Sequence, residues 1–329
     1  MSVDRTPQDG EQRPVRWGIL ATGKIAHNFA TDLALLADAE LSAVGSRSRA
    51  GAEAFADEYD VGRAYGSYEQ LAADPELDVV YVATPHGRHV EDVMTCFEAG
   101  KSVLCEKALT LDADTSVELV REARARGLFF AEAMWMRTIP AVRKAVSMAR
   151  EGRCGRLGQV RADLGLVAPY DPTDRLWDPA LGASALLDVG IYPLTLAHLV
   201  LGPPLEVSAS AVMSQAGTDV NGGATLTYAS GAVASLSWTQ TAWSPTDASI
   251  AGDTGRIELP AGFHHCESFD YVVGDQVEAF TEPTAGRGYV HEAQEVQRCL
   301  RAGLIESVLL PLDETVEIMR VMDRIRACF

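Results

Sequence analysis

Along the first part of the chain, short apolar runs alternate with segments in which apolar residues recur every three or four positions. The short runs predict strands, and the periodic segments predict helices. The predicted strands cover residues 15–20, 41–46, 78–84, 101–106 and 128–133, and the predicted helices cover residues 23–37, 49–59, 88–100 and 112–127. Strands joined by helical crossovers run parallel. The pattern therefore predicts an α/β fold with a doubly wound parallel sheet over residues 14–134.

The second part of the chain has a different pattern, in which β-rich, alternating segments are joined by short turns. Predicted strands cover residues 158–167, 206–214, 223–230, 232–242, 247–252 and 255–260, and predicted helices cover residues 140–152, 183–202, 291–303 and 313–327. Short turns make most of these strands antiparallel. We predict an α+β domain over residues 135–329, with an open sheet that helices cover on one face. The polar residues 1–13 read as a disordered tail.

An open sheet with one uncovered face predicts a homodimer. We expect about six strands and too few helices for both faces. Val233 and Leu236 fall on opposite sides of one strand by the period of two, so apolar side chains are expected on both faces. A two-fold, sheet-on-sheet contact would remove the uncovered face from water.

The amino-acid composition indicates which kinds of binding partner to expect. The chain has 28 basic and 46 acidic residues, a net charge of −18, which argues against nucleic-acid and anionic-membrane partners. We find no signal peptide and no apolar run of the roughly 20 residues that span a membrane. The six cysteines are scattered, which predicts reduced thiols and a cytoplasmic location. The adjacent His264, His265 and Cys266 have no evident partner ligands, so we predict a loop there and no metal site.

A glycine-poor version of the dinucleotide fingerprint follows the first predicted strand. G-x-G-x-x-G/A maps onto Ala21, Gly23 and Ala26 in the segment WGILATGKIA. Gly23 lets the backbone approach a pyrophosphate, which then faces the N-terminus of the helix. An ordinary tight turn is the alternative. The predicted cofactor contacts in this loop are Ala21, Thr22, Gly23, Lys24 and Ile25.

The end of the second predicted strand indicates which dinucleotide is bound. NAD enzymes place a carboxylate here to bind the ribose hydroxyls. This chain instead has Ser46, Arg47, Ser48 and Arg49. Hydroxyl and guanidinium donors suit a 2′-phosphate, so we predict NADP(H) in preference to NAD(H), with Ser46 and Arg47 as contacts. Ser48 is also a good helix N-cap, which is compatible with that role.

Charged side chains end the apolar strand SVLCE, at Glu106 and Lys107. The carboxyl ends of parallel strands are where open sheets bind ligands, although a surface ion pair is the simpler alternative. Asp188 and Tyr192 are four residues apart and share one helix face. A helix N-cap is the alternative for Asp188, and an aromatic that fills the core between the domains is the alternative for Tyr192.

Taken together, these segments resemble the glucose–fructose oxidoreductase/inositol dehydrogenase (Gfo/Idh/MocA) family. The matching segments lie in order over about residues 15–200: GILATGKIA, SRSRAGAEAFADEY, DVVYVATPHGRHVEDV, AGKSVLCEKALT, AEAMWMR and GASALLDVGIYPL. The last two look most like the dihydrodiol and xylose dehydrogenase branch. The resemblance implies a Rossmann domain followed by the β-rich domain.

The same resemblance implies the catalytic residues. Lys107 matches the lysine of the family's Glu-Lys-Pro pattern, with Ala108 in place of the proline, and Asp188 and Tyr192 match its Asp and its His or Tyr. Reduction of a ketone needs a hydride and a proton. Lys107 is expected to lower the pKa of Tyr192 and to hydrogen-bond the developing oxyanion. Asp188 would orient a substrate hydroxyl or the lysine.

Other predicted contacts follow from their positions near the strand ends and the domain junction. For the cofactor they are Thr84, Pro85, His86, His89, Glu106, Lys107, Trp135 and Arg137. For the substrate they are Trp135, Arg175, Trp177 and Asp188. His89 could instead belong to the first turn of a helix, Trp135 could pack in the core, and residues 170–179 could form a simple crossover loop.

The chain is therefore predicted to be an NADP(H)-dependent oxidoreductase that acts on a sugar, polyol or dihydrodiol. One alternative is a deoxysugar 3-ketoreductase of a biosynthetic pathway. Another is a non-catalytic NADP-binding sensor on the same fold. The presence of Lys107, Asp188 and Tyr192 argues against the sensor.

Overall fold

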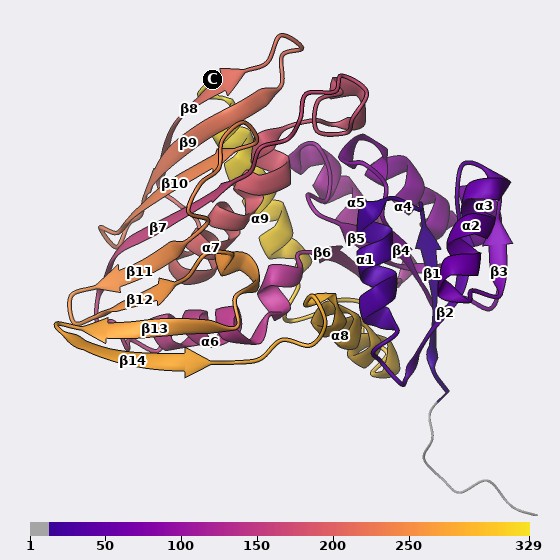
Figure 1. The fold of residues 1–329 in the computed structure, drawn as a ribbon, viewed down its shortest axis with the longest axis horizontal. Helices are drawn as coiled ribbons and strands as arrows, with labels where there is room; N and C mark the ends of the chain where they lie inside the picture. Colours follow the sequence, from indigo (N-terminus) through magenta and orange to yellow (C-terminus); the bar gives the residue numbers. More distant parts are fainter. Residues whose placement is uncertain (1–12) are drawn as a thin grey trace, which may run out of the picture.

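The computed structural model describes residues 13–329, whose strands form two separate sheets (Figure 1). The first is a parallel sheet in the order β3-β2-β1-β4-β5-β6. Its strands are β1 (Val15–Leu20), β2 (Ala39–Gly45), β3 (Arg63–Tyr65), β4 (Val79–Val82), β5 (Ser102–Glu106) and β6 (Phe130–Ala133). The strand order reverses between β1 and β4, the switch point at which such sheets bind ligands.

Helices cover both faces of this sheet: α1 (Lys24–Leu33), α2 (Arg49–Tyr59), α3 (Tyr68–Ala72), α4 (His89–Glu98) and α5 (Ala113–Arg126). Their ends follow from local chemistry. Asp112 accepts a hydrogen bond from the backbone N–H of Thr115 and begins α5, and Gly127 ends it in the left-handed region with φ 64°. The predicted doubly wound domain is confirmed. Only β3 and α3 are too short for the periodicity to predict.

The second sheet has eight strands in the order β14-β13-β12-β11-β7-β10-β9-β8. They are β7 (Leu157–Gly165), β8 (Glu206–Met213), β9 (Asp219–Thr227), β10 (Val233–Thr239), β11 (Ala248–Gly252), β12 (Arg256–Leu259), β13 (Ser268–Val273) and β14 (Gln276–Thr281). All neighbours pair antiparallel except β7 and β10. The prediction of an open, mostly antiparallel sheet is confirmed, but the expected six strands are wrong because the hairpin of β13 and β14 was missed.

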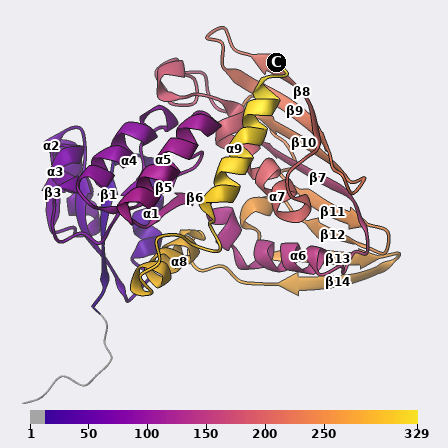
Figure 2. The same cartoon turned by 180° about the vertical axis from the view of Figure 1, so that it is seen from behind.

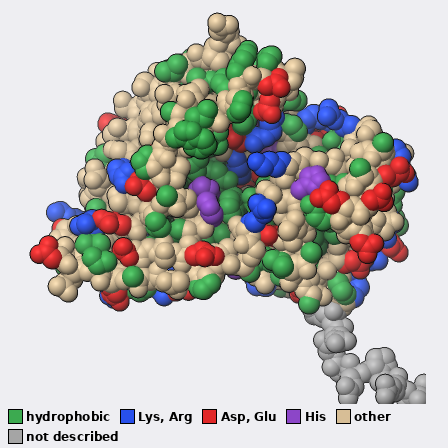
Figure 3. All heavy atoms as spheres, in the orientation of Figure 1, with side chains coloured by type: hydrophobic (Ala, Val, Ile, Leu, Met, Phe, Trp, Pro, Cys, Tyr) green, Lys and Arg blue, Asp and Glu red, His purple; other side chains and the backbone are tan. Residues whose placement is uncertain are grey.

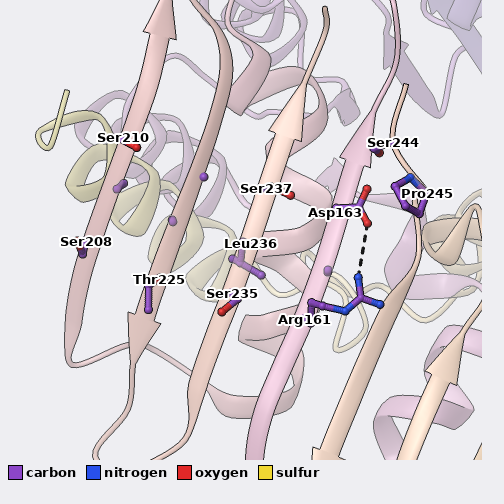
Figure 4. A pocket seen from close by; sticks show the side chains of 14 residues that line it. Arg161, Asp163, Ser208, Ser210, Thr225, Ser235, Leu236, Ser237, Ser244 and Pro245 are labelled. Carbon is purple, nitrogen blue, oxygen red and sulfur yellow. Dashed lines mark ion pairs between the residues drawn. The ribbon is translucent and has the colours of Figure 1, made fainter. Parts of the chain in front are cut away.

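Helices α6 (Pro140–Arg150), α7 (Ile191–Leu201) and α9 (Leu312–Arg326) lie on one face of this sheet (Figure 2). On β10, Leu236 is buried on the helix side and Val233 is half-buried on the other. The open face carries mainly hydroxyl side chains at its centre, among them Ser208, Ser210, Thr225, Ser235 and Ser237 (Figure 4). The expectation of an apolar open face is therefore wrong, because short polar residues occupy the outward positions of the central strands.

The end of the chain returns to the first sheet. Helix α8 (Tyr289–Arg301) packs against α1, and α9 packs against α5. Asp32 of α1 accepts hydrogen bonds from the backbone N–H groups of Arg287 and Tyr289, at 2.9 and 3.0 Å. The predicted boundary at residue 134 thus falls between the two sheets, while the C-terminal helices contact both domains.

Two expectations concern the chain outside these sheets. The predicted tail at residues 1–13 lies outside the described residues except for Arg13, which pairs with Asp78 at 2.6 Å. One segment, Pro179–Leu201, is long and apolar enough to cross a membrane by length and composition, which the sequence prediction overlooked. In the fold it is a core segment, and 89% of its most apolar window is buried.

Candidate active site

The turn between β1 and α1 has the backbone that a dinucleotide loop needs. Ala21 adopts φ 86°, in the left-handed region that the fingerprint's first glycine usually supplies. An ideal Cβ on Gly23 would meet nothing within 4 Å, so the space beside this residue is open. Gly23 caps α1 without any side-chain hydrogen bond, which leaves the first N–H groups of the helix for a ligand. The loop fits a pyrophosphate.

The residues after β2 fit a 2′-phosphate. Ser46 is buried, and its hydroxyl lies 3.4 Å from that of Thr22 in the phosphate loop. Arg47 is exposed and forms no ion pair with any residue between 13 and 329. Arg49 pairs instead with Glu53, at 2.7 Å. Of the two arginines, Arg47 has the guanidinium that is available to an anion.

The fold brings Lys107 and Asp188 together, although they are 81 residues apart in sequence. Lys107 follows the last residue of β5, and its peptide bond to Ala108 is cis. Its Nζ donates to the backbone carbonyl of Asp188 at 2.6 Å and lies 3.3 Å from the carboxylate Oδ1. Arg175 donates from Nη1 to the same Oδ1 at 2.9 Å. Asp188 is therefore bound by two cations.

This arrangement keeps Asp188 ionised. Burial alone raises the pKa of its carboxyl, but the charges of Lys107 and Arg175 outweigh burial and hold that pKa well below its usual range. His86 contributes in the same direction. The ammonium of Lys107 is in turn paired with the carboxylate of Asp188.

Asp188 lies in a π-helical turn, Leu186–Gly190, that leads directly into α7. Its side chain faces Lys107 and does not cap the helix, so the N-cap alternative is wrong. Tyr192 lies in the first turn of α7, with its ring 5.1 Å from Lys107 Nζ. The helix therefore presents both predicted residues to the end of β5.

Tyr192 is buried, with 7% of its surface exposed. Its hydroxyl accepts a hydrogen bond from Trp135 Nε1 at 2.8 Å. Burial raises its pKa well above 10, and the bond from Trp135 opposes this only in part. The expectation that Lys107 lowers this pKa is wrong, because the ammonium is directed at Asp188. Tyr192 is thus a protonated acid over the ordinary pH range.

Sequence reasoning missed two aromatic residues that pack on Tyr192 or on its partner Trp135. The ring of His264 lies 4.7 Å from the ring of Tyr192, and its Nε2 lies 3.1 Å from Nδ1 of His265. Tyr289, which begins α8, stacks on Trp135 at 4.6 Å. They lie 72 and 97 residues beyond Tyr192 in the sequence, so no local spacing indicates them. The adjacent histidines were considered only as metal ligands.

Residues that follow β4 hold the backbone of the loop that contains Lys107. Pro85 precedes a short 3-10 turn that contains His86, whose Nε2 lies 3.0 Å from the carbonyl of Lys107. His89 is fully buried, with its ring nitrogens 2.8 Å from the carbonyl of Thr84 and 3.0 Å from that of Ala108. His89 therefore holds this loop and has no surface for a cofactor.

Glu106 is buried, within reach of the charges of Lys107 and Arg175. It accepts a hydrogen bond from Tyr81 of β4, and burial raises the pKa of its carboxyl. Glu292 of α8 is buried nearby, and burial together with the Glu106 charge raises the pKa of Glu292 well above its usual range. Glu292 is not among the site residues predicted from the sequence.

Two of the predicted contact residues, Arg137 and Trp177, bond to residues other than Lys107, Asp188 and Tyr192. Arg137 is buried and pairs with Glu314 of α9. Trp177 donates from Nε1 to the carbonyl of Pro169 at 2.9 Å, within its own loop. Arg175 of the same loop does reach Asp188, and its side chain is 49% exposed. The loop therefore contributes a cation to the site.

The space-filling view shows a hollow between the two lobes (Figure 3). Lys and Arg side chains gather in this hollow, and histidine lies at its rim, in spite of the chain's net charge of −18. Among residues 13–329, no group of three or more His, Cys, Asp or Glu could hold a metal ion. The chemistry of the site is that of a proton donor, an ammonium and an ionised carboxylate.

Both halves of the chain match family models. Residues 15–133 match the model described as "Oxidoreductase family, NAD-binding Rossmann fold", and residues 142–258 match that of the "GFO/IDH/MocA C-terminal domain". The chain is 36% identical over 326 residues to trans-1,2-dihydrobenzene-1,2-diol dehydrogenase of Bos taurus, and 34% over 325 residues to that of Homo sapiens. Each match covers 95% of this chain and 96% of the relative.

Solved structures show the same fold. KijD10, a 3-ketoreductase from Actinomadura kijaniata solved in complex with NADP and TDP-benzene, matches with a TM-score of 0.86 and 26% identity, over 96% of this chain and 98% of that one. Aldose-aldose oxidoreductase from Caulobacter crescentus matches with a TM-score of 0.87, 20% identity, and coverage of 96% and 97%. At that identity the second likeness concerns the fold alone.

Proposed function

This chain belongs to the Gfo/Idh/MocA oxidoreductase family, and on that premise we propose that it interconverts a hydroxyl and a carbonyl on a dihydrodiol, sugar or polyol with NADP(H). As a member of that family it is an NAD(P)-dependent oxidoreductase that acts on CH–OH groups. The observation that carries the proposal is the convergence of Lys107, Asp188 and Tyr192 at the carboxyl end of β5.

The side chains divide the work as follows. When bound, the nicotinamide cofactor supplies or accepts the hydride. Tyr192 gives its proton to the substrate oxygen during reduction and takes it back during oxidation. Lys107, held in place by Asp188, donates a hydrogen bond to the same oxygen as negative charge develops. Arg175 presents its remaining N–H groups to other hydroxyls of the substrate.

The choice of substrate is tested with a panel. Dihydrodiols are the first candidates, because the curated relatives with 34–36% identity are named for one. A 3-keto deoxysugar is the second, because KijD10 is a 3-ketoreductase. Absorbance of NADPH is followed with trans-dihydrodiols, aldoses, polyols and nucleotide-linked ketosugars. If none of these compounds is turned over, the result favours a non-catalytic NADP-binding sensor.

Arg47→Ala is expected to weaken NADP(H) binding by about 10- to 100-fold, the cost of losing hydrogen bonds to a charged group. NAD(H) binding should stay near the parent value, since it has no 2′-phosphate. Titration by protein fluorescence measures both affinities. Arg49→Ala is the control, because Arg49 is already paired with Glu53. Equal affinities of the parent for the two cofactors would contradict the preference.

We also propose that the protein is a homodimer joined through the open face of the second sheet. Short hydroxyl side chains line a hollow on this face, and Arg161, which bonds to Asp247 at 2.8 Å, lies beside Asp163 in it (Figure 4). A two-fold axis can pair such a surface with itself. We expect a cytoplasmic location and no nucleic-acid or membrane partner.

Light scattering at low micromolar protein tests the dimer. The parent should have twice the 35.3 kDa mass of one chain. Ser237→Arg places a long charged side chain on the open face and should give the single-chain mass. Ser147→Arg, on the exposed side of α6, should leave the dimer intact. A parent at the single-chain mass would defeat the proposal.

A further inference from the structure

The π turn that carries Asp188 is held from the second sheet by one buried carboxylate. Asp219, the first residue of β9, is 4% exposed. Its Oδ1 accepts from Ser184 Oγ at 2.5 Å, and its Oδ2 accepts from the backbone N–H of Leu186 at 2.7 Å and from Trp238 Nε1 at 3.2 Å. All of these bonds fix the start of the turn to the sheet.

The next two N–H groups of this turn are also satisfied. Ser184 Oγ accepts from the N–H of Leu187 at 3.2 Å, and the carbonyl of Ser184 accepts from the N–H of Asp188 at 2.9 Å. Ser184 therefore caps the turn, and Asp219 holds the cap. A π turn is wider than an α-helix and moves carbonyls out of the usual ladder, and such turns occur often at functional sites. Here the carbonyl of Asp188 accepts the lysine ammonium.

Trp238 leaves the turn no room to shift. A Cβ on Gly190 would lie 2.9 Å from its indole ring, and a Cβ on Gly222 would lie 2.6 Å from it. The indole of Trp238 is thus packed between Gly190 at the end of the turn and Gly222 of β9, and its Nε1 donates to Asp219. Position and rotation of the turn are both determined by contacts with the sheet.

From this geometry we infer that Asp219 is a positioning residue for the reaction. Its three hydrogen bonds set the π turn so that both the carbonyl and the carboxylate of Asp188 face Lys107 Nζ. Asp219 touches neither substrate nor cofactor and acts through Asp188. The inference rests on the proposed function.

Asp219→Ala removes all three acceptors and is expected to lower kcat about 10²-fold, the typical cost of a displacement of about 1 Å. Asp219→Asn should stay within a few-fold of the parent. Its amide oxygen can accept from Leu186 and Trp238, while its NH₂ donates to Ser184 Oγ.

The pH profile separates positioning from stability. The groups that face Asp188 are Lys107, Arg175, His86 and the Tyr192 hydroxyl. When the turn moves, the cations no longer hold the pKa of Asp188 down, so in Asp219→Ala the acid limb of kcat should appear at higher pH. Asp74→Ala is the control, because Asp74 is equally buried and also accepts three hydrogen bonds, far from the site. It should lose stability and keep the parent profile.

The acetylation rate of Lys107 tests the position of the turn without any measurement of turnover. Acetic anhydride labels amines, and peptide mass spectrometry gives the rate at each lysine. Lys107 should react faster in Asp219→Ala than in the parent, with the exposed Lys24 as internal reference. If Asp219→Ala does not fold, Ser184→Ala removes one of the three bonds and should change the same quantities in the same direction, by less.

The inference is overturned if Asp219→Ala keeps the parent kcat, acid limb and Lys107 labelling rate. It is also overturned if Asp219→Asn is as defective as the alanine variant, because the hydrogen-bond pattern would then not be the cause. A parent without turnover on the whole panel would defeat the proposed function, and the labelling experiment would still decide the role of Asp219.

Discussion

Lys107→Met is expected to lower turnover about 10³-fold, at the upper end of the loss seen when one donor to a developing oxyanion is removed. Methionine keeps the length and apolar stem of the side chain but has no N–H to donate. Lys107 Nζ is also one of the two cations bound to Asp188, so its loss leaves that carboxylate with Arg175 alone. Cofactor affinity should stay within a few-fold of the parent, because the phosphate contacts lie after β1 and β2.

Steady-state kinetics and a fluorescence titration measure the two quantities separately. Lys101→Met is the matched control. Lys101 also donates to a backbone carbonyl, that of Leu77 at 3.3 Å, but it lies before the first residue of β5, at the strand end opposite Lys107. It should keep the parent turnover. A Lys107→Met enzyme that also keeps it would remove Lys107 from the mechanism.

Tyr192→Phe is expected to lower turnover about 10²–10⁴-fold, the contribution of general acid–base catalysis. Phenylalanine keeps the contacts with His264 and the ammonium but has no proton to give, and it leaves Trp135 Nε1 without its acceptor. Tyr271→Phe is the control, because its hydroxyl bonds only to the backbone of Arg153. Parent-like turnover of Tyr192→Phe would transfer the proton-donor role to Lys107.

The pH dependence of the parent follows from the same residue. Burial raises the pKa of Tyr192 well above 10, so its protonated form persists as the pH rises. Reduction uses that form, and kcat for reduction should remain on a plateau beyond pH 10. Oxidation needs the deprotonated form or a base that accepts its proton, and its rate should still be rising there. A reductive rate that falls with an apparent pKa near 7 would contradict this assignment.

Only part of this site was predictable from the residues themselves. Lys107 follows an apolar strand of a parallel sheet, at the end where open sheets bind ligands. Asp188 and Tyr192 share a helix face, but their spacing fits a helix cap and a core aromatic equally well, and the family resemblance connected them with Lys107. The electrostatics were not predictable in the same way. Whether Lys107 acts on Tyr192 or on Asp188 depends on distances of a few ångströms between segments 81 residues apart.

The elements that escaped prediction share a physical reason. The hairpin of β13 and β14 lies at an edge of the sheet, and β14 is mostly exposed, so burial imposes little alternation on its residues. His264 lies in a short turn before that hairpin and is positioned by packing on Tyr192 and Trp135. Asp219 likewise looks like an ordinary polar residue at the start of a strand. Only tertiary contacts assign these residues their roles.

The return of α8 and α9 to the first domain has a consequence for synthesis of the protein. The strands of the parallel sheet are synthesised before the helices that cover α1 and α5. Until then the indole N–H of Trp17, which donates to Gln297 of α8, and the backbone N–H of Phe130, which donates to the carbonyl of Ile305, lack these acceptors. The nascent cofactor domain is therefore incomplete until α8 and α9 have been translated, and a premature stop before α8 would leave apolar surface on α1 and α5 exposed.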